Sequence, residues 1–190
     1  MSVLCVFGDS ITWGAWDLEL GGWVNRLRLY FDSQNQETEI YNNGVDGDYV
    51  GDVLKRIDAE AEARNPNIII LAIGINDSPH SSNPTGTDLK EFDADYRKLL
   101  EKAKKFTDKV VIAGLTNVDN EKTDGYKNDK IAIYNEKIKE IAGSQNIPFI
   151  DLFGILSAGE FGDGLHPNSI GHQKIFEKVN EVLGVKKHAT

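Results

Sequence analysis

The chain has 190 residues, of which 40% are hydrophobic, so it can bury one core without disulfides or structural metal ions, and we expect a single domain over residues 1–190. Its formal net charge of -9 at pH 7 repels phosphate backbones and anionic membrane surfaces, which argues against a nucleic-acid partner. No segment approaches the roughly 20 apolar residues of a membrane span, and the N-terminus lacks the pattern of a secretory signal, so we expect a cytoplasmic protein without stable membrane insertion.

Short runs of apolar and β-branched residues predict five buried strands. In chain order, these strands cover residues 3–7, 39–41, 68–73, 110–115 and 148–151. The single cysteine, Cys5, lies inside the first run, so it is expected to pack in the core and has no partner for an intramolecular disulfide.

Stretches between these strands carry apolar residues at the i, i+3, i+4, i+7 spacing of a helix face. This spacing predicts helices over residues 50–61, 92–103, 131–141 and 168–183. We expect the third of them to end at Gly143 in a left-handed cap, and the last to start at Pro167. The alternation predicts an α/β fold with a doubly wound, five-stranded parallel sheet, whose ligands bind beyond the carboxyl ends of the strands.

The segment 8–12 follows the first strand and carries the first candidate catalytic residue, Ser10. A serine that enters a helical turn at this place has its hydroxyl exposed near unpaired backbone N–H groups. Taken alone, however, such a serine more often only caps a helix. Neither the G-x-G-x-x-G pattern nor a Walker lysine follows this strand, which disfavours a phosphate-binding loop.

A candidate base lies near the other end of the chain, in the segment 163–167. The three-residue spacing of Asp163 and His166 allows the carboxylate to reach the imidazole Nδ1, which leaves Nε2 free to face Ser10. This pair is weak evidence by itself, because two such residues often share a turn for capping alone.

The other histidines are His80, in a polar loop, His172, on the last predicted helix, and His188, in the tail. Each is expected to be solvated or structural. Together with one buried cysteine they give no zinc-type spacing, so we expect no metal site.

Hydrogen-bond donors follow the second and third strands. The segment 42–48 is rich in glycine, which lets a backbone N–H approach a ligand, and Asn76 in the segment 74–77 offers a side-chain amide. With the N–H of Ser10, these groups would form three donors around a developing oxyanion. Each segment alone is also a common turn sequence.

Together, these patterns resemble the SGNH hydrolase family, also called GDSL esterases and lipases, from residue 8 to residue 167. The resemblance implies that Ser10, Gly44, Asn76 and His166 are the residues for which the family is named, with Asp163 as the third member of a catalytic triad. It also implies a flavodoxin-like three-layer α/β/α domain, no cofactor, and hydrolysis of esters or thioesters through an acyl-serine intermediate. The oxyanion hole would then consist of Ser10, Gly44 and Asn76.

Four further residues are expected to contribute to this site. Asp9 and Asp77 stand next to predicted site residues and are expected to support them. Tyr49 stands where the family often has a smaller polar residue, so it is expected to alter the wall of the pocket. Trp13, close behind Ser10, either lines the pocket or packs in the core.

The predicted loops 78–87 and 116–127 are polar and carry no apolar insertion that would form a lid. We therefore favour small substrates with short acyl chains, such as O-acetyl groups on sugars or alcohols. Lysophospholipase, acyl-thioesterase and acyl-transferase activities use the same machinery and stay open. A different kind of function is also compatible with these patterns, namely a non-catalytic flavodoxin-like domain that binds a ligand at the same strand ends. The sequence does not predict the oligomeric state.

Overall fold

The computed structural model describes residues 2–184, so His188 lies outside the described part of the chain. Five parallel strands form one sheet in the order β2-β1-β3-β4-β5. The strands are β1 (Ser2–Gly8), β2 (Thr38–Gly44), β3 (Ile68–Ala72), β4 (Val110–Ala113) and β5 (Phe149–Ile150). This strand order is the flavodoxin-like arrangement, and it confirms the predicted doubly wound fold.

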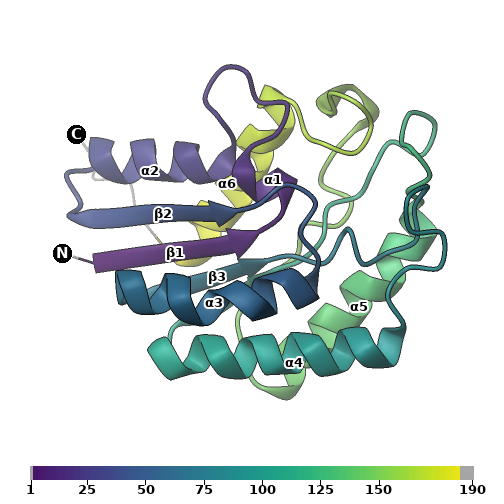
Figure 1. Cartoon of the computed structure of the whole chain (residues 1–190). Coiled ribbons are helices and arrows are strands. Elements are labelled where there is room, and N and C mark those ends of the chain that lie inside the picture. Colours follow the sequence, from purple (N-terminus) through teal and green to yellow (C-terminus); the bar gives the residue numbers. More distant parts are fainter. Residues whose placement is uncertain (1, 185–190) are drawn as a thin grey trace.

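Helices cover both faces of the sheet, which gives the three layers of an α/β/α fold (Figure 1). The pair α2 and α6 lies on one face, and α3, α4 and α5 lie on the other. The helices are α1 (Ser10–Trp13), α2 (Trp23–Ser33), α3 (Val50–Arg64), α4 (Leu89–Phe106), α5 (Asn128–Ser144) and α6 (Ser169–Leu183), with a short 3-10 turn η1 (Ala158–Glu160).

Two helix ends differ from the prediction. Helix α5 continues through Gly143 to Ser144, and the left-handed residue is Asn146, whose φ is 53°. Helix α6 begins after Pro167, because the side chain of Asn168 accepts hydrogen bonds from the first free N–H groups of the helix. Within residues 2–184, no helix is long and apolar enough to cross a bilayer.

The register of the sheet brings the ends of three strands side by side. Gly8 at the end of β1 pairs with Gly44 on one side and with Ala72 on the other. A side chain at Gly8 would place its Cβ 2.1 Å from the Thr12 hydroxyl and 2.4 Å from the Ala72 carbonyl oxygen, so only glycine fits there. The segments after β1, β2 and β3 therefore leave the sheet at one edge, where a shared site can form.

Candidate active site

Ser10 and His166 meet at this edge although 156 residues separate them in the sequence. Ser10 begins α1 directly after β1, and His166 lies in the loop between η1 and α6. The His166 Nε2 atom is 2.9 Å from the Ser10 Oγ atom, and the His166 Nδ1 atom is 2.7 Å from Asp163 Oδ2. These two hydrogen bonds form one continuous line from the hydroxyl to the carboxylate.

Asp163 both holds the imidazole and shapes the turn that carries it. Its Oδ1 atom accepts hydrogen bonds from the N–H groups of Leu165, at 2.9 Å, and His166, at 2.8 Å. Burial alone would raise the pKa of Asp163, but the hydrogen bonds from His166 outweigh this effect and hold that pKa below its ordinary value. An ionised carboxylate favours a proton on Nδ1, which leaves the lone pair of Nε2 facing the Ser10 hydroxyl.

The side chain that caps α1 belongs to Asp9 and not to Ser10. Asp9 Oδ1 accepts a hydrogen bond from the Ile11 N–H at 3.0 Å, so the Ser10 hydroxyl is left to bond with His166. Both residues are buried, with 3% of each exposed. Burial raises the pKa of Asp9 from 3.8 to about 7. Asp9 thus supports the turn at Ser10 through the backbone.

The amide of Asn76 is held from two sides. Its Nδ2 atom donates to the Asp48 carbonyl oxygen at 3.0 Å, and its Oδ1 atom accepts from the Tyr126 hydroxyl at 2.8 Å. One Nδ2–H remains for a ligand. The sequence did not indicate Tyr126, although it is an aromatic residue in an otherwise polar loop and is buried.

The structure does not leave Gly44 free to donate. The Gly44 N–H already donates to Asn42 Oδ1 at 3.0 Å. A Cβ at Gly44 would lie 2.3 Å from the backbone nitrogen of Trp13, so this glycine allows β2 to pack closely against α1. Gly47, with a φ of 77°, lines the same cavity as Asn76 and His166 and replaces Gly44 as the candidate donor.

Asp77 fixes the segments that surround these donors. Its Oδ2 atom accepts from the Val50 N–H at 3.0 Å, at the start of α3, and its Oδ1 atom accepts from the Thr87 hydroxyl at 2.8 Å. Burial raises the pKa of Asp77 to about 6. On the other side, Arg56, which the sequence also did not indicate, bonds to Asp48 Oδ2 at 2.8 Å and to the Asn43 carbonyl oxygen at 2.8 Å.

A cavity of about 480 Å³ opens beside His166. Tyr49 lines it, and so does His80, which was expected to be solvated or structural. Trp13 is not among the described residues that line this cavity, and 59% of it is exposed. The remaining lining residues are Gly47, Asn76, Ser82, Lys122, Asp124, Tyr126, Asp163 and Leu165.

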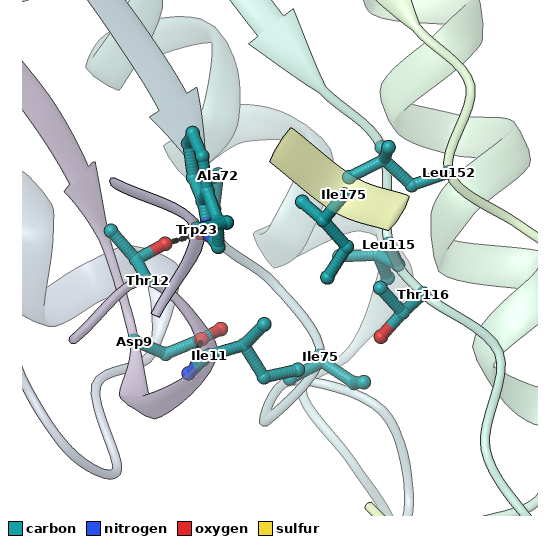
Figure 2. A pocket seen from close by; sticks show the side chains of 11 residues that line it. Asp9, Ile11, Thr12, Trp23, Ala72, Ile75, Leu115, Thr116, Leu152 and Ile175 are labelled. Atoms are coloured by element: carbon teal, nitrogen blue, oxygen red, sulfur yellow. Dashed lines mark hydrogen bonds between the residues drawn. The ribbon is translucent and has the colours of Figure 1, made fainter. Parts of the chain in front are cut away.

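A second cavity, of about 20 Å³, lies against Asp9, Ile11 and Thr12 (Figure 2). Asp9 and Thr116 are among its polar lining residues, and apolar side chains such as Ile11, Ile75 and Leu115 surround them. A cavity that holds a water molecule needs roughly 10–15 Å³, so this one has room for about one water and not for an acyl chain. The larger cavity is therefore the candidate ligand site.

His172 is buried, as expected for a histidine with a structural role. Its ring nitrogen Nε2 lies 3.0 Å from the Ala15 carbonyl oxygen, to which it donates. Burial lowers the pKa of His172 to about 4, so this side chain is neutral in the fold. Among residues 2–184, no group of three or more His, Cys, Asp and Glu side chains is arranged to hold a metal ion.

Comparisons with known proteins show the family of this chain. The model of the GDSL-like lipase/acylhydrolase family matches residues 6–174. A multidomain esterase from Ruminococcus flavefaciens is 30% identical over 129 residues, which are 66% of this chain and 16% of that protein. The chain thus spans about a sixth of the length of this relative.

Two solved structures share the fold. A lipase/acylhydrolase from Enterococcus faecalis has a TM-score of 0.84 at 22% identity, and the match covers 100% of both chains. An acetylxylan esterase from Geobacillus stearothermophilus, solved as a catalytic mutant, has a TM-score of 0.82 at 20% identity, over 100% of this chain and 97% of that chain.

Proposed function

Since the chain belongs to the GDSL-like lipase/acylhydrolase family, we propose that it hydrolyses small, short-chain acyl esters through an acyl-serine intermediate on Ser10. The observation that carries this proposal is the line of two hydrogen bonds, 2.9 Å and 2.7 Å long, from the Ser10 hydroxyl through His166 to Asp163. A serine hydroxyl is a weak nucleophile unless a base of this kind removes its proton.

In the proposed reaction, Ser10 Oγ attacks the ester carbonyl carbon while His166 Nε2 takes the hydroxyl proton. The tetrahedral intermediate collapses as His166 returns this proton to the leaving alcohol oxygen, and the acyl group stays on Ser10. A water molecule then attacks the acyl carbon and gives a proton to His166. This proton returns to Ser10 Oγ as the carboxylic acid leaves.

The oxyanion of each tetrahedral intermediate needs donors that are already in place. We assign this role to the N–H groups of Ser10 and Gly47 and to the free Nδ2–H of Asn76. Ser10 begins α1, so its N–H is one of those that a helix leaves unpaired. Gly47 takes the place that the resemblance gave to Gly44, whose N–H is already bound.

Acetyl esters of sugars or other polar alcohols are the substrates we propose. The cavity beside His166 is lined by two tyrosines, two histidines, a serine and charged side chains, which suit a polar leaving group. The acetylxylan esterase that shares the fold makes acetylated sugars the first class to test.

The test is a rate profile over p-nitrophenyl esters of increasing acyl length, followed by acetylated sugars. We expect acetyl and propionyl esters to be the best substrates and Ser10→Ala to lose turnover. Ser33→Ala, on an exposed helix end, is the matched control and should retain turnover. An organophosphonate should label the native protein and the control on Ser10 but not label Ser10→Ala.

Two results would contradict the proposal. Near-normal turnover by Ser10→Ala would remove Ser10 from the reaction. A native protein that is inert toward all esters and toward the phosphonate would favour the non-catalytic ligand-binding domain instead.

A further inference from the structure

The side chain of His80 is held rigidly in the wall of the large cavity. Its backbone N–H and carbonyl oxygen each bond to Asn83 at 3.0 Å, which closes a tight loop. Its ring stacks on Tyr126, with ring centroids 4.5 Å apart and planes inclined by 2°. A solvated loop histidine would not need contacts on both its backbone and its ring face.

The hydrogen bonds of His80 define which ring nitrogen is left for a ligand. Its Nδ1 atom lies 2.8 Å from the Ser78 carbonyl oxygen, which can only accept, so Nδ1 carries the proton. In the neutral ring, Nε2 is then a bare acceptor. None of the hydrogen bonds among residues 2–184 uses this atom.

A second loop presses against the loop of His80 and keeps it in place. The Ser81 hydroxyl donates to Asp124 Oδ1 at 2.6 Å, and the Ser81 N–H donates to the Asp124 carbonyl oxygen at 3.3 Å. Gly125 fits here only without a side chain, because its Cβ would lie 2.5 Å from the Ser81 hydroxyl. The acceptor of His80 is thus preorganised, which lowers the entropic cost of binding a ligand.

His80 is also close to the proposed reacting centre. The Tyr126 ring on which it stacks carries the hydroxyl that holds Asn76, and both residues line the cavity with His166. Charges of both signs, from Lys122 and Asp124, line the same cavity. Asp163 adds a second carboxylate to this wall, so an acceptor among one lysine and two carboxylates suits an uncharged ligand with several hydroxyl groups better than an anion.

We propose that His80 Nε2 accepts a hydrogen bond from a free hydroxyl group on the alcohol part of the substrate, so that the protein prefers monoacyl esters of polyhydroxylated rings over esters of plain alcohols. This inference rests on the proposed function and deepens it. A site built to bond a hydroxyl group discriminates strongly against an analogue that lacks this group.

The first test compares two acetates with six-membered rings. A monoacetylated methyl xylopyranoside carries free hydroxyl groups, and cyclohexyl acetate carries none. For the native protein we expect kcat/KM to be at least tenfold higher for the sugar ester. His80→Phe keeps a ring that can stack on Tyr126 but has no acceptor, so the ratio of the two kcat/KM values should fall about tenfold. His80→Gln, which has an acceptor oxygen, should recover part of it.

A purely structural role for His80 predicts another pattern. Both esters would then lose rate by the same factor in His80→Phe, and the ratio would not change; this result would overturn the inference. If the native protein hydrolyses neither ester nor any p-nitrophenyl ester, the proposed function fails and this inference fails with it.

A second measurement does not depend on how His80→Phe folds. In the Ser10→Ala protein, a saturating concentration of the sugar ester should shift the imidazole ¹⁵N resonance of His80 Nε2 and leave that of Nδ1 nearly unchanged. Cyclohexyl acetate should leave both resonances in place. The absence of any Nε2 shift with the sugar ester would also overturn the inference.

Discussion

Tyr126→Phe should slow the chemical step without changing substrate binding. The substitution removes one atom, the hydroxyl oxygen that donates to Asn76 Oδ1 at 2.8 Å. Because Asn76 is 6% exposed, water does not readily replace this donor. The Nδ2 bond to the Asp48 carbonyl oxygen remains, at 3.0 Å, so we expect the amide to loosen and not to flip.

The expected losses of kcat and of stability in Tyr126→Phe follow from known magnitudes. Removing an oxyanion donor outright costs roughly 10²–10³ in kcat, and a loosened donor should cost a part of this, about 3–10-fold. A buried acceptor left without a partner costs about 1–3 kcal/mol in the free energy of unfolding. For a chain of this size, each kcal/mol corresponds to about 2–4 °C in Tm.

The assay is the kinetics of acetyl ester hydrolysis for Tyr126→Phe, Asn76→Ala and the double variant. If Tyr126 acts through Asn76, adding Tyr126→Phe to Asn76→Ala should cause no further loss of kcat. Tyr134→Phe is the matched control, since its buried hydroxyl donates to the Thr87 carbonyl oxygen at 2.6 Å. It should lose similar stability and retain kcat.

If the two losses of kcat multiply in the double variant, Tyr126 does not act through Asn76. If Tyr126→Phe raises KM alone, its hydroxyl acts on substrate binding and not on the chemical step.

Other predictions concern stability, measured by urea denaturation. Gly47→Ala should lower the free energy of unfolding by about 1–2 kcal/mol, since alanine is strained at the positive φ of this residue. Gly44→Ala should lower it more, by roughly 3 kcal/mol, because the new Cβ would overlap the backbone at Trp13. Equal losses would contradict the close packing at Gly44. Asp9→Asn keeps the cap acceptor but cannot ionise. Because burial raises the pKa of Asp9 from 3.8 to about 7, the native protein should lose stability as pH rises through this range. Asp9→Asn should not, so its free energy of unfolding relative to the native protein should rise with pH, by at most about 4 kcal/mol. A difference between the two proteins that does not change with pH would contradict this prediction. Burial lowers the pKa of His172 from 6.5 to about 4, so this residue should make the protein less stable as pH falls from 6.5 to 4. His172→Gln should remove this dependence of the free energy of unfolding on pH.

Local patterns predicted the parts of the structure that depend on neighbouring residues. The buried runs of β1, β3 and β4 and the spacing of Asp163 and His166 are of this kind. The β-α alternation implied a helix between the first two strands, but the bounds of α2 were not predicted. Trp23, Leu27 and Phe31 lie on its buried face, but this short pattern follows an irregular glycine-containing segment.

Features that depend on long-range partners did not follow from the sequence. The hydroxyl of Tyr126 bonds to a residue 50 positions away. The choice between Gly44 and Gly47 depends on where the side chain of Asn42 turns, because that side chain occupies the N–H of Gly44. Glycine content alone indicated the loop but not the donor.

Tyr126 joins two parts of the site that would otherwise be able to change separately. Its hydroxyl holds Asn76, and its ring face supports His80. A mutation that reshapes the His80 loop to admit a different alcohol will therefore also disturb Asn76, the proposed oxyanion donor. Evolution toward new leaving groups should pass through slower intermediates unless a second substitution restores the tyrosine, and laboratory selections for altered specificity should recover paired changes in the two loops.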